Sequence, residues 1–95
     1  MSYLEAEPKM RELGWIVSVN GENILFEKKN HGLEMKVMIG KDPQDLYFVS
    51  VAILREGNLV EERRCGTKFA NSLYNNPIWM DRIFYGWVVP LMKKF

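Results

Sequence analysis

The chain has 95 residues, of which 47% are hydrophobic and 26% are charged, and its formal net charge is +1. These values fit a single globular domain over residues 1–95 and exclude a mainly disordered, collagen-like or coiled-coil chain. The near-neutral charge excludes a strong overall field for nucleic acid, and one cysteine with one histidine exclude an internal disulfide and a cysteine- or histidine-rich metal site.

The sequence shows no sign of a membrane or export signal. The first residues have neither a basic stretch nor an apolar core of a secretory signal. The longest apolar run, at 83–89, is far shorter than the roughly 18 residues of a membrane-spanning helix. A single cysteine suits a reducing compartment, so we expect a cytoplasmic protein without a transmembrane segment.

An N-terminal helix is predicted to end before Gly14, because glycine is the residue most common just after a helix C-terminus. Ser2 and Glu5 have the spacing of a capping box, so the helix can begin at Ser2. Pro8 lacks a backbone donor, however, and is favoured at the first helical position. A better-formed helix therefore begins near Glu7.

Five strands are predicted in the middle of the chain. They are rich in β-branched and aromatic residues and are separated by turn residues such as Asn20-Gly21 and His31-Gly32. None of the connections has the dozen residues that a parallel crossover needs, so the strands form an antiparallel meander. The predicted strands cover residues 15–19, 24–29, 33–39, 46–54 and 59–65.

The strands differ in how their apolar residues are spaced. Apolar and polar residues alternate in 33–39, which predicts one dry face and one wet face. The segment 46–54 is apolar on both faces, which indicates a central strand or one whose second face is covered. The segment 59–65 is polar, and its charges suit an edge strand that resists edge-to-edge association.

Two helices are predicted after the sheet. One is short and covers 69–74. The other begins after Pro77, runs from Ile78 to about Val89, and has Pro90 near its end. The predicted fold is therefore α+β: an N-terminal helix, a five-stranded antiparallel meander, and C-terminal helices packed on one face of the sheet.

Catalytic chemistry is not indicated. His31 lies between two turn formers, which is typical of an exposed turn residue rather than a catalytic base. Cys65 follows two arginines that could activate a thiol, but in a strand only Arg63 shares its face, and a half-buried small residue is the favoured interpretation. The chain also has no nucleotide-binding or nucleophile-elbow motif, so we expect no enzyme activity, no cofactor and no metal.

Charge is distributed unevenly along the chain. Residues 1–62 hold seven basic and eleven acidic residues, whereas residues 63–95 hold six basic residues and one acidic residue. Arg63, Arg64 and Lys68 lie beside Phe69, and cations next to aromatic rings can contact phosphates of single-stranded nucleic acid or an acidic partner. Chance clustering of solvated charges is the favoured alternative.

The last predicted helix has more apolar width than one sheet face buries. At 100° per residue, one stripe contains Trp79, Ile83, Trp87 and Leu91, widened by Phe84, Val88 and Phe95, and Tyr85, Val89 and Met92 lie toward the far side. Arg82, Gly86 and Lys93 form the polar strip. Core packing, an interface, and insertion in a membrane surface remain open. As interface anchors, the sequence indicates Trp79, Phe84, Tyr85 and Trp87.

The opening helix, the Leu-Gly-Trp step into a hairpin and the short meander loosely resemble small accessory proteins of phages and prophages. The resemblance covers about half of the chain, has no motif and assigns no residue a role. It implies a small cytoplasmic protein that acts by binding.

We therefore predict a small non-enzymatic binding module that self-associates and regulates or inhibits a macromolecular partner. The alternative is a protein that binds nucleic acid or a nucleotide through the basic C-terminal third. A small enzyme that uses Cys65 and His31 is the third hypothesis.

Overall fold

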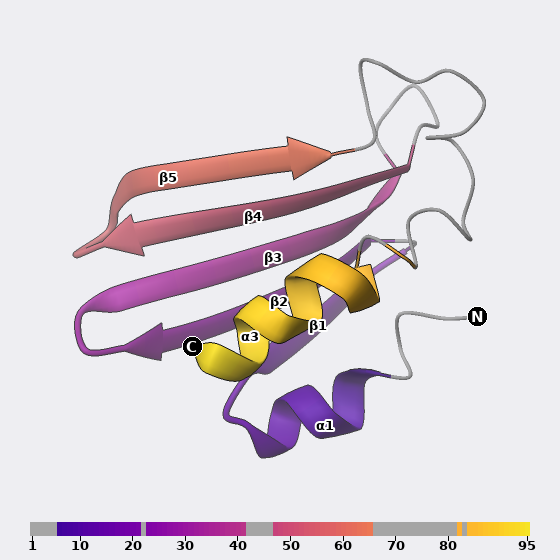
Figure 1. Ribbon diagram of the computed structural model, residues 1–95, viewed down its shortest axis with the longest axis horizontal. Helices are drawn as coiled ribbons and strands as arrows, with labels where there is room; N and C mark the ends of the chain where they lie inside the picture. Colours follow the sequence, from indigo (N-terminus) through magenta and orange to yellow (C-terminus); the bar gives the residue numbers. More distant parts are fainter. Residues whose placement is uncertain (1–5, 22, 42–46, 66–81, 83) are drawn as a thin grey trace.

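The computed structural model describes residues 6–21, 23–41, 47–65, 82 and 84–95 (Figure 1). The described strands form one sheet in the order β1-β2-β3-β4-β5, and every neighbouring pair is antiparallel. The predicted α+β class and the antiparallel meander are confirmed. The described elements are α1 (Glu7–Glu12), β1 (Ile16–Asn20), β2 (Asn23–Asn30), β3 (Leu33–Lys41), β4 (Tyr47–Arg55), β5 (Asn58–Cys65), the π-helix η2 (Phe84–Val88) and α3 (Val89–Lys94).

Helix α1 begins at Glu7 with Pro8 in its first turn, which matches the predicted start near Glu7. It ends in a Schellman arrangement: Gly14 N donates to Arg11 O at 3.1 Å and Trp15 N donates to Met10 O at 3.0 Å. Gly14 adopts a φ of 94°, which a side chain would disfavour. After this turn, Trp15 is only 3% exposed and belongs to the core with Met10. The first strand therefore begins at Ile16 and not at the predicted residue 15.

Two-residue turns join the strands β2–β3 and β4–β5. His31 and Gly32 have φ values of 51° and 80°, and Glu56 and Gly57 have 51° and 85°. Positive φ at both central positions matches the twist of a tight hairpin. The two turns lie together, because Glu56 N donates to Gly32 O at 3.1 Å. His31 is exposed there, as predicted.

One face of the sheet carries the core. The register aligns Val17, Phe26, Val37 and Val51 across four strands, and each is buried. The buried residues of α1, η2 and α3 belong to the same cluster. The Phe26 and Phe84 rings stack with centroids 5.9 Å apart. The prediction of one dry face for 33–39 is confirmed by Met35, Val37 and Ile39.

The second face of β4 is covered at one point. Phe48 is 5% exposed, and the Arg64 guanidinium of β5 lies 4.3 Å from its ring centroid. At Phe48, the apolar second face of the segment 46–54 is therefore covered by a side chain of the neighbouring strand, and β4 is the fourth of the five described strands. The predicted edge position of β5 is confirmed, and Leu59 and Val60 are 59% and 60% exposed.

The C-terminal helix differs from its prediction. Pro90 does not end the helix, and α3 continues to Lys94. The proline lies in the first turn of α3, where the backbone N–H of a residue makes no hydrogen bond within the helix, so its absence costs nothing. The wider turn of η2 also shifts the helix faces. Val89 and Met92 are consequently buried, whereas Leu91 of the predicted main stripe is 39% exposed.

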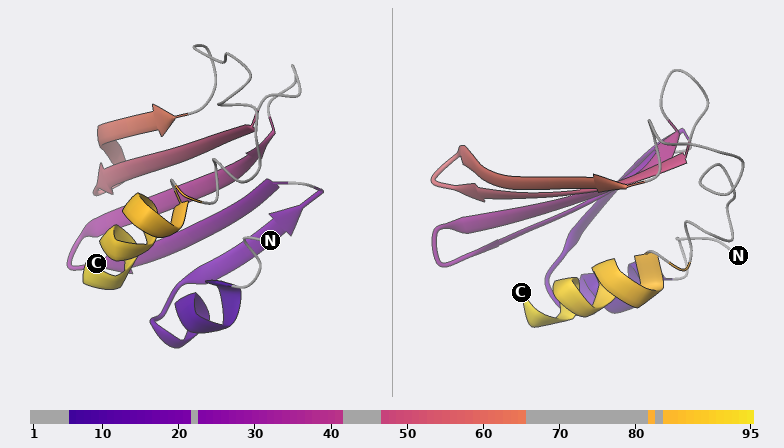
Figure 2. Two further views of the ribbon diagram at one scale, coloured as in Figure 1. Left: turned by 45° about the vertical axis from the view of Figure 1, so that its right-hand side comes forward. Right: turned by 45° about the horizontal axis from the view of Figure 1, so that its top comes forward.

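The described helices do not cover the sheet evenly. In Figures 1 and 2, α1 and α3 lie over the side of β1, β2 and β3, and β4 and β5 extend beyond them. Asn30 of β2 fixes the end of the chain by donating from Nδ2 to the Phe95 backbone oxygen at 2.6 Å. The predicted helix over 69–74, with Ser2, Lys68 and Trp79, lies outside the described residues. The packing of all helices on one face thus stays a prediction.

Candidate functional site

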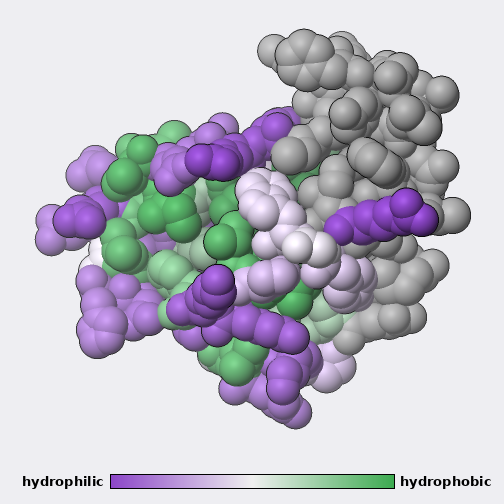
Figure 3. All heavy atoms as spheres, in the orientation of Figure 1, coloured by the Kyte–Doolittle hydropathy of each residue, from purple (hydrophilic) through white to green (hydrophobic). Residues whose placement is uncertain are grey.

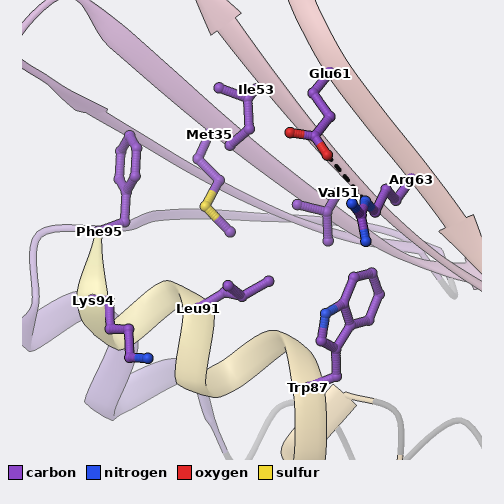
Figure 4. Close-up of a pocket in the computed structure, with 9 residues that line it drawn as sticks. All are labelled: Met35, Val51, Ile53, Glu61, Arg63, Trp87, Leu91, Lys94 and Phe95. Atoms are coloured by element: carbon purple, nitrogen blue, oxygen red, sulfur yellow. Dashed lines mark hydrogen bonds and ion pairs between the residues drawn. The ribbon is translucent and has the colours of Figure 1, made fainter.

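A hollow of about 410 Å³ lies where β4 and β5 extend beyond the C-terminal helix (Figure 4). We call it the β4–α3 hollow. Met35, Val51 and Ile53 line it from the sheet, and Trp87, Leu91 and Phe95 line it from the helix side. Its charged residues are Glu61, Arg63 and Lys94. The volume is in the lower part of the range of about 300–1,000 Å³ that is typical of small-molecule sites.

A β-bulge determines which side chains of β5 reach the hollow. Leu54 pairs with Leu59, but Ile53 pairs with Glu61, so Val60 is the extra residue. Since one residue of shift moves every later side chain to the other face, the bulge places Glu61 and Arg63 on the face of Ile53 and Val51. Without it, Val60 would stand opposite Ile53.

Glu61 and Arg63 form an ion pair beside the hollow. Arg63 Nε donates to Glu61 Oε1 at 3.0 Å, and the side chains are 69% and 56% exposed for Arg63 and Glu61 respectively. Such an exposed pair adds little stability. In Figure 4 the Arg63 guanidinium points from β5 toward the indole of Trp87, so a cation stands at the sheet side of the apolar lining.

The C-terminal helix forms the other wall of the hollow. Trp87 near the end of η2, Leu91 of α3 and Phe95 line the hollow from the helix side. Trp87 is half-buried, and Leu91 is 39% exposed. Figure 3 shows hydrophobic side chains gathered over β3 and β4 on this side of the molecule, bordered by hydrophilic ones. The hollow therefore lies beside the core, with Met35 and Val51 buried at its base and with Ile53, Trp87 and Leu91 leaving apolar surface partly exposed around it.

The predicted interface residues separate in the structure. Phe84 is fully buried, stacks on Phe26 and meets Tyr85 edge-on at 4.9 Å, so it is a core residue of the single chain. Tyr85 is 37% exposed, and Trp87 lines the hollow. The polar strip of Arg82, Gly86 and Lys93 is exposed, as predicted.

Of the three predicted phosphate-contact residues, Arg63 and Arg64 lie on opposite faces of β5, and Lys68 lies outside the described residues. Arg63 pairs with Val51 in the register and shares its face, whereas Arg64 pairs with Ser50 on the opposite face. Arg63 bonds to Glu61, and Arg64 covers Phe48. Because these two arginines lie on opposite faces of the edge strand β5, a phosphate could contact both of them only at the open edge of the sheet. Cys65 pairs with Val49 in the register of β4 and β5.

Several residues of the hollow were not indicated by the sequence. The set consists of Met35, Val51, Ile53, Glu61 and Lys94, whereas Leu91 belongs to the apolar stripe that the sequence indicates. Alternation predicts that the three strand residues face inward, but it does not predict where the helix stops covering them. The charged pair depends on the bulge, for which the segment 58–61 has no glycine or proline signal.

Comparisons with known proteins add no family. The chain has no significant match to a protein-family model, to a curated protein or to a solved structure. Within the described residues, no group of three or more His, Cys, Asp or Glu side chains is placed to hold a metal ion. No helix in the described part of the chain is long and apolar enough to cross a membrane.

Proposed function

We propose that the protein is a small non-enzymatic binding module that self-associates and regulates or inhibits a macromolecular partner. The observation that carries this proposal is the apolar surface that the C-terminal helix leaves outside its own core. Tyr85 and Leu91 are 37% and 39% exposed, and half-buried Trp87 lies between them in sequence, next to the hollow. Surfaces of this composition are typical of protein interfaces.

A second copy of the chain is the partner proposed first. Most soluble homo-oligomers are two-fold dimers, in which the same surface of each copy faces the other. Tyr85 and Trp87 of the predicted anchors present surface for such a contact, and Leu91 joins them. Phe84 supports the interface only indirectly, because its ring holds η2 against β2.

The finer features of the prediction are part of this proposal. We propose that all helices gather on the face of the sheet that carries Phe26 and Val37, because the described ones contribute to that core. We also propose a cytoplasmic location, since one cysteine suits a reducing compartment.

Light scattering from low to high micromolar concentration tests self-association. We expect a mass above that of the 11.2 kDa chain at high concentration. Leu91→Glu should shift the protein to folded monomer, because it places a charge in the apolar surface. Leu59→Glu is the matched control, as Leu59 is also exposed but lies outside the hollow. A folded wild-type monomer at every concentration would contradict the proposal.

A further inference from the structure

We infer that the β4–α3 hollow binds a free amphiphile with an unbranched apolar chain and a carboxylate head. This inference goes beyond the proposed function, because it concerns a small ligand and does not need a macromolecular partner. It is argued from the size, the shape and the charges of the hollow.

The size of the hollow fits a small ligand better than a protein surface. Its volume is about 410 Å³, and nine of the residues that the structure describes line it. A stable protein–protein interface uses about 20–30 residues from each side. The hollow can therefore enclose a small molecule by itself, whereas a protein partner would need additional surface around it.

The shape of the hollow is that of a trough along the helix. Its helix wall extends from Trp87 to Phe95, which is about 12 Å at the rise of an α-helix. Val51 and Ile53 of β4 form the opposite wall, and Figure 4 shows Leu91 and the Met35 sulfur pointing into the space between them. An elongated, apolar space of this length suits an unbranched hydrocarbon chain.

The charges of the hollow favour an anionic head. Arg63 and Lys94 contribute two cations, against one carboxylate from Glu61. The Arg63 guanidinium has five N–H donors, of which the one on Nε serves Glu61. Its terminal nitrogens can therefore bind a second carboxylate, and the planar fork of arginine matches both oxygens of such a group.

A homologous ligand series tests this inference on the full chain. Calorimetric titration would use hexanoate, octanoate and decanoate below their micelle-forming concentrations. Each added methylene group should strengthen binding roughly fourfold until the trough is full. Decyltrimethylammonium, with the same chain length and a positive head, should bind at least about tenfold more weakly. Absence of binding, or equal affinity for the cationic and anionic ligands, would overturn the inference.

Two pairs of variants locate the site. Arg63→Gln should weaken decanoate binding about tenfold or more, because it removes a charged hydrogen-bond donor. Arg64→Gln is the control, since Arg64 is the next residue but lies on the other face. Leu91→Trp should block the hollow, whereas Leu59→Trp should not. Equal effects of Arg63→Gln and Arg64→Gln, or undiminished binding by Leu91→Trp, would overturn the assignment to this hollow.

The titration and the scattering experiment can fail independently. Binding of decanoate to a protein that stays monomeric would support the ligand site and contradict self-association. Self-association without decanoate binding would do the opposite.

Discussion

The core face of the sheet is closed over β2 and β3, but toward its β5 edge it is open at Ile53 of β4 and at Arg63 of β5. Phe26, Val37 and Ile39 are 1% exposed or less, whereas Ile53 is only half-buried and Arg63 is exposed. Both parts have the same antiparallel pairing. The difference between the closed and the open part of this face therefore comes from where the described helices lie and from one bulge in β5, which turns charged side chains to the face of Ile53.

Substitution of Phe26 should show the largest difference between the two parts. Phe26→Ala removes a fully buried ring that stacks on Phe84, and should lower the free energy of unfolding by about 3–5 kcal/mol. Leu91→Ala, in the open part, should cost less than about 1 kcal/mol, because its side chain is already partly in water. Urea denaturation of both variants measures the contrast, and equal losses would show that the open part is packed as tightly as the core.

The hairpin turns should not distinguish the two parts. Gly32→Ala at the β2–β3 turn and Gly57→Ala at the β4–β5 turn each force a side chain into positive φ, at a cost of about 1–2 kcal/mol. Neither added methyl group meets another atom within 4 Å, so the cost is backbone strain alone. Gly86→Ala, which has the same open space without positive φ, is the control and should not destabilise the protein. Unequal losses for the two turns would mean that tertiary packing contributes.

The two arginines of β5 should differ in a smaller way. Arg64→Ala uncovers the Phe48 ring and should cost about 0.5–1 kcal/mol. Arg63→Ala breaks an exposed ion pair and should cost less than about 0.5 kcal/mol. Thermal unfolding of the two variants compares them. A larger loss for Arg63 would show that this residue stabilises the fold instead of bordering an open hollow.

Most of the sheet could be predicted from the sequence, because its signals are local. The period of two in 33–39 and the turn residues His31-Gly32 together determine the strands, faces and register of β2 and β3. The Glu56-Gly57 turn determines the β4–β5 pairing only as far as the bulge at Val60. The charged sequence of 59–65 also predicted the edge position correctly.

The C-terminal helix and the hollow could not be predicted in the same way. A count at 100° per residue fails across η2, since its turn is wider than that of an α-helix, and Val89 and Met92, which the count placed toward the far side, are buried. The hollow depends on where α3 lies over the sheet, which is a tertiary property. The residue pattern of a single helix or strand does not predict this position.

Solvent accessibility of methyl groups tests most directly the central claim, that the core face of the sheet is open at Ile53 of β4. A soluble paramagnetic probe added to the dilute protein broadens the NMR signals of methyl groups that solvent reaches. Ile53 and Leu91 of the hollow should be broadened strongly, whereas Ile24 and Ile39, which are 6% and 1% exposed, should be protected. Equal protection of all four methyl-bearing residues would contradict the account, because it would mean that the hollow is closed in solution.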